Sequence, residues 1–561
     1  MCVTLITMLW QMQMRRGILD PETAPIFYRL FLFEDYGASF LFVAVLLGAM
    51  VPAAQTAGRA VSLALGRVPL AVALACSAAL AIASVTIYHA HPLAMDESAP
   101  VMQSMAFASG RLLGQYPSAL IDWLIYPPFQ NYFIHVSRES GLVASAYWPG
   151  FALLLTPFTA IGAAWLCNPI LGGLSIWVIQ RLTRELTGSI EAAGCAVLFT
   201  IASAAFVINS ISFYSMTAHL LCNGTFALLL LKPTPIRALV AGFIGGLALT
   251  LHNPIPHLLF AIPWAAWLTL RTDRLRLIAA AAAGYAPWVV IVGFGWYEVL
   301  QGLKPPGTDG MVAPGSLASA LGMLGSVFSL PGGSQIIDRV IGLAKLWLWA
   351  APALILMAGI GFWRHRRDGR FRWLLAGAVL TLVGYLFVPL SGGHGWGFRY
   401  FHSAWFVLPV LAAAALAPRS TDASKSEHPT GGLTGYSQAA ALGGLLVMVP
   451  YFAWQVQSFI SAHLAQAPVA DHGSARVVII SPFMQYYAQD LVQNDPFLRQ
   501  STIRMASRGR PADARMMAEH FPDLVLLGKD YRGSVWGYED PGERDRSSAQ
   551  VAGDAAASRS R

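Results

Sequence analysis

The chain has 561 residues, of which 56% are hydrophobic and 12% are charged, and its formal net charge is +8. Soluble domains carry about a quarter of charged residues, so this composition excludes an ordinary soluble globular protein and indicates a membrane protein. The positive charge comes mostly from arginines between apolar runs, and no interleaving of basic and aromatic residues favours nucleic acid as a partner.

Apolar runs long enough to cross roughly 30 Å of hydrocarbon as helices recur along the chain. The expected spans are 38–56, 68–88, 189–209, 213–231, 236–252, 255–270, 275–297, 341–361, 373–391, 400–417 and 437–458. The run 149–181 is broken at Asn168 and Pro169, which predicts a kinked span, a hairpin or a re-entrant segment. Together these runs predict an all-α polytopic membrane protein with about 12–13 transmembrane helices.

The distribution of arginine predicts the orientation of these helices. If the run 149–181 makes one net crossing, QRLTREL, KPTPIR, RTDRLR and RHRRDGRFR all face one way, and this side should be the cytoplasm, because short cytoplasmic loops are enriched in basic residues. The long segments 89–147, 252–257, 298–340 and 391–400, and the chain after about residue 459, then face the other side. Arginines flank the first run on both sides, so the side of the N-terminus stays open.

The chain divides into four parts by composition. Residues 1–66 form an N-terminal extension with one apolar helix, and 67–460 form the main transmembrane domain with the long outer loop 89–147. Residues 466–540 alternate strand and helix patterns and predict a small βαβαβ domain outside the cytoplasm, without a glycine motif for nucleotides. The expected strands are RVVIISPF, STIRMAS and DLVLLG, and the expected helices are MQYYAQDLVQ (484–493) and ADARMMAEHF. Residues 541–561 predict a disordered tail.

Four of the five cysteines lie inside apolar runs, and no pair has CxxC spacing. The cysteines therefore support neither a disulfide framework nor a thiolate zinc site, and the sequence predicts no metal-ligating residue with certainty.

An acidic pair opens the long outer loop. Asp96 and Glu97 stand in HPLAMDESAP, directly after the apolar run 68–88. One interpretation is a pair of solvated carboxylates at a helix end. The other is that one of them serves as a general base or metal ligand, because its pKa can be tuned at the boundary of the bilayer.

The glycine-rich turn SGGHGWGFRY should lie on the same face. Arg399 is placed to bind an anionic phosphate, and Tyr400 and His394 lie beside it; the alternative for Arg399 is snorkelling at the interface. His219 is a candidate ligand or donor in MTAHLLCNGT, although a lone helical histidine is more often a packing residue. Lys304 has the same two interpretations as His219, a functional residue or a structural one.

In their order along the chain, these pieces resemble the polytopic GT-C glycosyltransferases, specifically protein O-mannosyltransferases, lipid A aminoarabinose transferases and related bacterial enzymes. The similar stretches are AMDESAPVMQSMAFASGRLLGQYP, SAYWPGFALLLTPFTAIGAAWLCNPILGG, MTAHLLCNGT and GGHGWGFRY. The resemblance covers roughly 65–460. Two departures are the extra apolar segment before residue 65 and HNPIPH where many members have Arg-Pro, which leaves the substrate open.

The resemblance implies a glycosyltransferase of the bacterial inner (plasma) membrane with its active site on the extracytoplasmic face. It implies a polyprenyl-phosphate sugar donor, a lipid, glycan or protein acceptor, transfer with inversion, and Asp96 as general base. Arg399 would neutralise the donor phosphate, aided by Arg111, Arg138, Lys304 or a divalent metal ion as cofactor. Alternatives are a transporter or flippase of envelope lipids or glycans, an assembly scaffold, and a polysaccharide ligase or polymerase.

Overall fold

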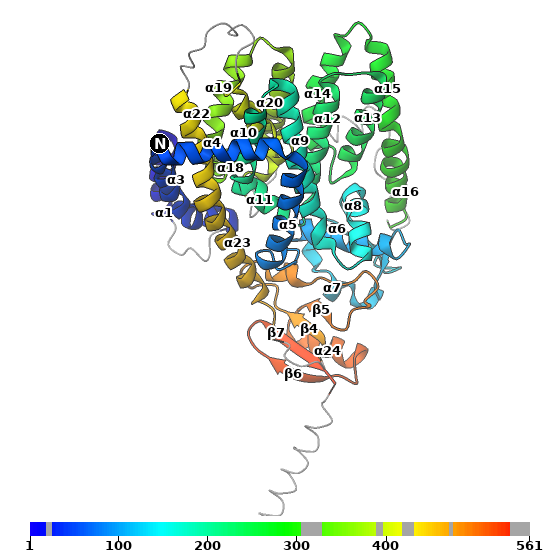
Figure 1. The fold of residues 1–561 in the computed structure, drawn as a ribbon. Coiled ribbons are helices and arrows are strands. Elements are labelled where there is room, and N and C mark those ends of the chain that lie inside the picture. The colour runs from blue at the N-terminus through cyan, green and yellow to red at the C-terminus, as the bar shows by residue number, and fades with distance from the viewer. Residues whose placement is uncertain (18–24, 304–327, 389–395, 418–430, 470–474, 539–561) are drawn as a thin grey trace, which may run out of the picture. The chain divides into compact units, whose positions relative to one another are not determined.

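The computed structural model describes residues 1–17, 25–303, 328–388, 396–417, 431–469 and 475–538. The chain forms two compact units. The first contains Met1–Pro92, Tyr147–Gly302 and Pro306–Ser458, and the second contains Leu93–Ala146, Leu303–Pro305 and Phe459–Arg561. Figure 1 labels most of the elements of both units.

The first unit is helical throughout its described part. Its α-helices are α1 (Cys2–Arg15), α2 (Ile26–Arg29), α3 (Asp35–Gly48), α4 (Pro52–Arg67), α5 (Pro69–Thr86), α8 (Gly150–Ala160), α9 (Cys167–Thr187), α10 (Ile190–Ile201), α11 (Ala204–Ile211), α12 (Met216–Leu230), α13 (Pro235–Thr250), α14 (Ile255–Thr269), α15 (Arg274–Pro287), α16 (Gly295–Gln301), α18 (Gly333–Trp349), α19 (Leu354–His365), α20 (Gly369–Leu386), α21 (Val407–Ala414), α22 (Gly431–Gly443) and the start of α23 (Val449–Leu464). Short π- and 3₁₀-helical turns join them, among them η1 (Leu30–Glu34), η5 (Trp288–Phe294), η6 (Arg399–Ala404) and η7 (Gly444–Met448).

Four continuous helical stretches of the described chain are long and apolar enough to cross a membrane: Ile26–Gly48, Pro69–Thr86, Arg274–Gln301 and Gly432–Leu464. Two helix pairs, α10 with α11 and α18 with α19, pass the same test together but bend by 65° and 91°. Other apolar helices, including α8 and α12 to α14, are shorter. The polytopic helical fold is therefore present, while the number of about 12–13 spans stays a prediction.

Two predicted boundaries are wrong. The first span ends at Gly48 and not at residue 56, because Pro52 begins a new helix, α4. The interruption in 149–181 falls between Ala160 and Cys167, where Gly162 adopts the left-handed conformation at φ 72°. Asn168 and Pro169 lie in the first turn of α9, where proline is tolerated.

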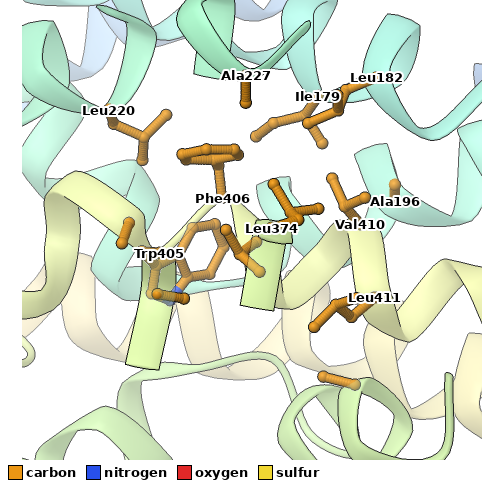
Figure 2. Packing of buried hydrophobic residues seen from close by; sticks show 14 of the residues in the cluster. Ile179, Leu182, Ala196, Leu220, Ala227, Leu374, Trp405, Phe406, Val410 and Leu411 are labelled. Atoms are coloured by element: carbon orange, nitrogen blue, oxygen red, sulfur yellow. The ribbon is translucent and has the colours of Figure 1, made fainter. Parts of the chain in front are cut away.

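The core of the first unit surrounds the segment that follows Arg399. Figure 2 shows Phe406 in the middle of apolar side chains from several helices, with Leu220 and Ile179 on either side. Trp405 and Phe406 are 1% and 0% exposed. Burying two large aromatic side chains directly after η6 fixes this turn in the core, at a gain of about 2 to 3 kcal/mol for each side chain.

The second unit contains α6 (Met95–Ala108), α7 (Ile121–Leu124), α24 (Arg510–His520) and two small sheets. Strands β1 (Gly114–Gln115), β3 (Leu142–Ser145) and β2 (Ile134–Val136) form an antiparallel sheet in that order. In the register of this sheet, Gly114 pairs with Val143, and Ile134 pairs with Ser145. The long outer loop is therefore an ordered part of this unit.

The other sheet has the order β5 (Ile503–Ala506), β4 (Ala475–Ile480), β7 (Gly533–Gly537) and β6 (Val525–Lys529). Only β4 and β5 are parallel, and β6 joins through an antiparallel hairpin with β7, a strand that was not predicted. The predicted helix over 484–493 is wrong, because Tyr486 and Tyr487 have positive φ angles and only the 3₁₀ turn η8 (Ala488–Leu491) forms.

Candidate functional site

Glu97 stabilises the helix on which it lies. It occupies the third position of α6, its side chain is fully buried, and its carboxylate accepts a hydrogen bond from the backbone N–H of Leu93. The bond ties Leu93, the residue before the N-cap, to the first turn of the helix, and a glutamate here faces the positive end of the helix dipole. Ala94 offers no side-chain cap, so this bond closes the helix start. The structure gives Glu97 a local structural role.

Asp96 lies beside Glu97 but is only half-buried. It is the second residue of α6, so it shares the favourable position at the helix N-terminus. Of the predicted acidic pair, Asp96 is therefore the carboxylate with access to solvent and to a reactant.

A third carboxylate near the start of α6 was missed by the sequence reasoning. Asp490, in η8, is 4% exposed, and its Oδ1 accepts a hydrogen bond of 2.6 Å from the backbone N–H of Met95. Burial raises the pKa of Asp490 to about 8, the bond from Met95 lowers it, and the negative charges of Asp96 and Glu97 raise it. The available signal was an aspartate inside the apolar segment AQDLV.

Two arginines meet at Tyr400 in the first unit. The guanidinium carbon of Arg399 lies 5.4 Å from the centre of the Tyr400 ring and 5.5 Å from that of Tyr214. Arg339 of α18 lies 5.5 Å from the Tyr400 ring and is only 4% exposed. Tyr385 stacks on Tyr400 with ring centres 5.4 Å apart. Aromatic faces stabilise each cation, and guanidinium groups are well suited to binding the oxygens of an anion.

The sequence reasoning chose Arg399 and Tyr400 but missed Arg339. The sequence feature that could have indicated Arg339 is a charged residue within IIDRVIGLAKLWLW, since charges inside apolar helices are costly and often functional. One Arg339 N–H group donates a hydrogen bond to the backbone oxygen of Val388. This bond fixes the guanidinium group against the C-terminal end of α20.

A buried polar network connects to the same turn. The Nδ1 atom of His257 lies 2.7 Å from Oδ1 of Asn223, and its Nε2 lies 2.7 Å from the Tyr285 hydroxyl. The amide N–H of Asn223 donates to the backbone oxygen of Ser403 in η6. The network thus ties α12, α14 and α15 to the segment that begins with Arg399.

His219 lies one helical turn before Asn223 on α12 and is 2% exposed. Within the described part of the chain, neither ring nitrogen of His219 has a hydrogen-bond partner. A buried polar group without a partner is rare, and a bound water or ligand is the usual reason. His219 therefore stays a candidate for substrate binding.

The structure does not bring the other predicted basic residues together with Arg399. Arg111 is exposed, 5.5 Å from the ring of Phe497, and Arg138 forms an ion pair of 2.7 Å with Asp122. Both lie in the second unit, and Arg138 is held at the surface. Lys304 and His394 lie outside the described residues. In the part of the chain that the structure describes, no group of three or more His, Cys, Asp or Glu side chains is arranged to hold a metal ion.

No protein-family model matches the chain, and no curated protein sequence matches it. Among solved structures, ArnT from Cupriavidus metallidurans bound to undecaprenyl phosphate is similar, with 12% identity, a TM-score of 0.49 and coverage of 84% of this chain and 98% of ArnT. Its apo state matches with 12% identity, a TM-score of 0.48 and coverage of 83% and 97%. The likeness concerns the course of the chain, and no residue role is taken from it.

Proposed function

We propose that this protein is a membrane glycosyltransferase that moves a sugar from a polyprenyl-phosphate donor to an acceptor hydroxyl on the extracytoplasmic face, with inversion. The observation that carries the proposal is the pair of guanidinium groups at Tyr400, inside a largely apolar helical unit. Arginine is well suited to binding phosphate oxygens, and its fork of N–H groups can bind two of them at once.

The chemistry of such a donor explains why the reaction needs a general base but no general acid. A polyprenyl phosphate leaves as a stable anion, so the leaving group needs no proton. Arg399 and Arg339 would neutralise its negative charge as the glycosidic bond breaks, a contribution of about 10²- to 10³-fold by analogy with other preorganised sites. Each methylene of the lipid disfavours water by about 0.8 kcal/mol, so the polyprenyl chain stays in the bilayer.

The acceptor hydroxyl has a high pKa and needs a base, which contributes about 10²- to 10⁴-fold. Asp96 is proposed for this role. Glu97 is buried and caps its own helix, and Asp490 is buried and holds its proton to a higher pH, whereas Asp96 keeps solvent access. Attack by the deprotonated oxygen on the anomeric carbon, opposite the departing phosphate, gives inversion.

The test compares Asp96→Asn with Glu97→Gln in the purified full-length protein, using a radiolabelled polyprenyl-phosphate sugar and a membrane lipid and glycan extract as acceptor. We expect Asp96→Asn to lower transfer at least 100-fold, because an amide cannot take the acceptor proton. Glu97→Gln keeps an oxygen for the Leu93 N–H group and should retain most activity.

The exposed Glu139 lies in the same unit, and Glu139→Gln serves as the matched control. All variants should be equally abundant in the membrane. Full transfer by Asp96→Asn would remove Asp96 from the mechanism. To find the sugar and acceptor, envelope glycans and lipids from cells with and without the gene would be compared by mass spectrometry.

One observation bears on the alternative that the protein is a transporter. Ionisable residues inside membrane helices are often functional in transporters, and Lys345 of α18 and Asp35 of α3 form a buried ion pair of 2.7 Å. Trp349 Nε1 also donates to Asp35. Because both charges are paired and hydrogen-bonded, the cluster stabilises helix packing and does not by itself require a transported ion.

A further inference from the structure

The helix α18 contacts the N-terminal extension with one of its faces. The Tyr28 hydroxyl donates a hydrogen bond of 2.7 Å to Oδ1 of Asp338. The Asp35 carboxylate accepts from Lys345 Nζ at 2.7 Å and from Trp349 Nε1 at 3.0 Å. Positions 338, 345 and 349 are seven and four residues apart, which places them on the same face of the helix. The extension therefore holds α18 at three points along this face.

A π-helical turn directly precedes Asp35 and sets its direction. A π-helical turn contains an extra residue, which rotates the residues after it about the helix axis, and such turns are frequent at functional sites. The buried Gln11 of α1 donates a hydrogen bond of 2.7 Å to the backbone oxygen of Phe31 within this turn, η1. Its Oε1 accepts from Ser39 Oγ at 3.2 Å. The extension thus has its own bonds that keep Asp35 directed at α18.

The same helix contacts the turn that carries Arg399. A Cβ atom on Gly342 would lie 2.6 Å from Cε2 of Phe398, so α18 packs directly on the residue before Arg399. Arg339, three positions before Gly342, lies against the Tyr400 ring. Phe398 and Tyr400 meet edge to face, with ring centres 6.1 Å apart. A shift of α18 would therefore displace both arginines.

Trp349 gives a second connection from Asp35 to this turn. Its indole N–H donates to Asp35, and its ring centre lies 6.1 Å from that of Trp396. Gly397 adopts a left-handed conformation at φ 71°, and a Cβ atom there would lie 3.5 Å from the Trp349 Cβ. The backbone that leads to Arg399 therefore runs directly beside Trp349.

We propose that Asp35 and Tyr28 are positioning residues, through which the N-terminal extension holds Arg339 and Arg399 in the geometry that binds the donor phosphate. What these arginines bind rests on the proposed function, whereas their placement by the extension does not. A purely structural ion pair can be replaced by apolar residues without loss of function. Binding groups, in contrast, must be held within about 0.5 Å of the productive geometry. The two roles therefore predict different results.

Transfer kinetics of the full-length protein in phosphatidylcholine nanodiscs, with a radiolabelled polyprenyl-phosphate sugar, separate them. Tyr28→Phe and Asp35→Asn should each raise the KM for the donor about three- to tenfold and leave the KM for the acceptor within about twofold. Asp35→Leu combined with Lys345→Met leaves no buried charge unpaired, so it should melt close to the wild-type temperature and still raise the donor KM.

Tyr436→Phe is the matched control. Its hydroxyl donates to the backbone oxygen of Leu46 and so ties α22 to the far end of α3, and its loss should leave both KM values unchanged. A wild-type donor KM in Tyr28→Phe, Asp35→Asn and the double variant, or equal changes for donor and acceptor, would overturn the positioning role.

A double-mutant cycle shows whether Tyr28 acts through Arg339. In the Arg339→Met background, Tyr28→Phe should change the donor KM by less than about 1.5-fold, because the group that it positions is gone. Effects of the two substitutions that multiply would show that Tyr28 acts independently, and would overturn the proposal.

Hydrogen–deuterium exchange gives a readout that needs no activity. In Asp35→Asn and the double variant, the amides of residues 396–404 should exchange faster, while those of α13 in the same unit stay as in the wild type. Unchanged exchange at 396–404, or equal increases in both segments, would overturn the positioning role even where transfer falls. Faster exchange confined to 396–404 in a protein that transfers no sugar would support the positioning role and refute the proposed function.

Discussion

Arg399 and Arg339 illustrate how single residues define the proposed donor site. Both guanidinium groups lie within 5.5 Å of the centre of one phenol ring. Guanidinium groups placed this close together can bind oxygens of one phosphate, which would then accept charge-assisted hydrogen bonds from both.

We therefore expect Arg399→Ala and Arg339→Met each to raise the KM for the polyprenyl-phosphate sugar at least tenfold, because a charged hydrogen-bond donor to phosphate is lost. The KM for the acceptor should stay within about twofold. Steady-state transfer kinetics with each substrate varied in turn measure both values. Arg366→Ala, which removes an exposed arginine from the loop after α19, should change neither. Equal losses for donor and acceptor would argue against a phosphate role.

Asp490 gives a prediction about pH. The ordinary pKa of its carboxyl is 3.8, and in the folded protein it is about 8. Between these values the folded state keeps a proton that the unfolded state has lost, so raising the pH through this window lowers the free energy of unfolding, by at most about 1.4 kcal/mol per pH unit.

Asp490→Asn removes this titration and retains an oxygen for the Met95 N–H group. The variant should therefore melt at a higher temperature than the wild type at about pH 8 and at a similar temperature at about pH 4. Thermal melting of the detergent-solubilised protein across this range checks the difference. Asp523→Asn, at an exposed position of the same unit, should follow the wild-type curve. A wild-type curve for Asp490→Asn as well would contradict the assignment.

The residues that sequence reasoning found and missed differ in one physical respect. Asp96 and Arg399 stand at the ends of apolar runs, where a charge is visible against its surroundings. Asp490 becomes important only because folding brings it to the backbone of Met95, 395 positions away along the chain. Arg339 likewise becomes part of the cluster through Tyr400 of η6. Such contacts depend on tertiary structure, which local patterns do not contain.

At the scale of elements, apolar runs predicted most helices well, because each run must bury or shield its backbone in lipid. They failed where the backbone conformation decides the boundary. Pro52 starts α4 at a position where hydropathy alone continues the span, and Gly162 interrupts the run 149–181. Similarly, β7 follows the tight turn at Asp530, whose carboxylate accepts from the N–H groups of Arg532 and Gly533. Hydropathy and strand propensity do not report these local bonds.

The pairing of α3 with α18 is also invisible in the sequence. Asp35 and Lys345 are separated by 310 positions, and both side chains are at most 1% exposed. Neither charge would be tolerated alone in an apolar interior, since desolvation costs several kcal/mol for each ion. The pair therefore favours the contact between α3 and α18, and it links the N-terminal extension to the rest of the first unit.

At the scale of the whole molecule, compact units and sequence order do not coincide. The second unit joins the long loop 93–146 to the chain after residue 458. The Trp123 indole N–H donates a hydrogen bond to Asp513, and Asp122 pairs with Arg508 at 2.7 Å, so both segments share one polar surface. A sequence read in order predicts a loop and a separate C-terminal domain, because it does not show which distant segments meet.

Because the loop 93–146 and the C-terminal part of the chain form one unit, they give one common prediction for their side of the membrane. Segments that fold into one unit outside the bilayer must lie on one side of it, so the loop 93–146 and the chain after residue 475 must face the same compartment. The arginine-rich segments predict that this compartment is extracytoplasmic and that residues 271–276 and 364–372 face the cytoplasm.

Single cysteines at Ser140, Arg515, Thr272 and Arg367, in a background carrying Cys2→Ala, test this arrangement. These positions are exposed, whereas the remaining native cysteines are buried or partly buried. In right-side-out membrane vesicles, an impermeant maleimide should label Ser140→Cys and Arg515→Cys at once, but Thr272→Cys and Arg367→Cys only after permeabilisation. The reverse pattern would place Asp96 on the cytoplasmic side and contradict the proposed extracytoplasmic reaction. Opposite results for Ser140→Cys and Arg515→Cys would contradict the second unit itself, because one folded unit cannot present its two chain segments on both sides of a bilayer.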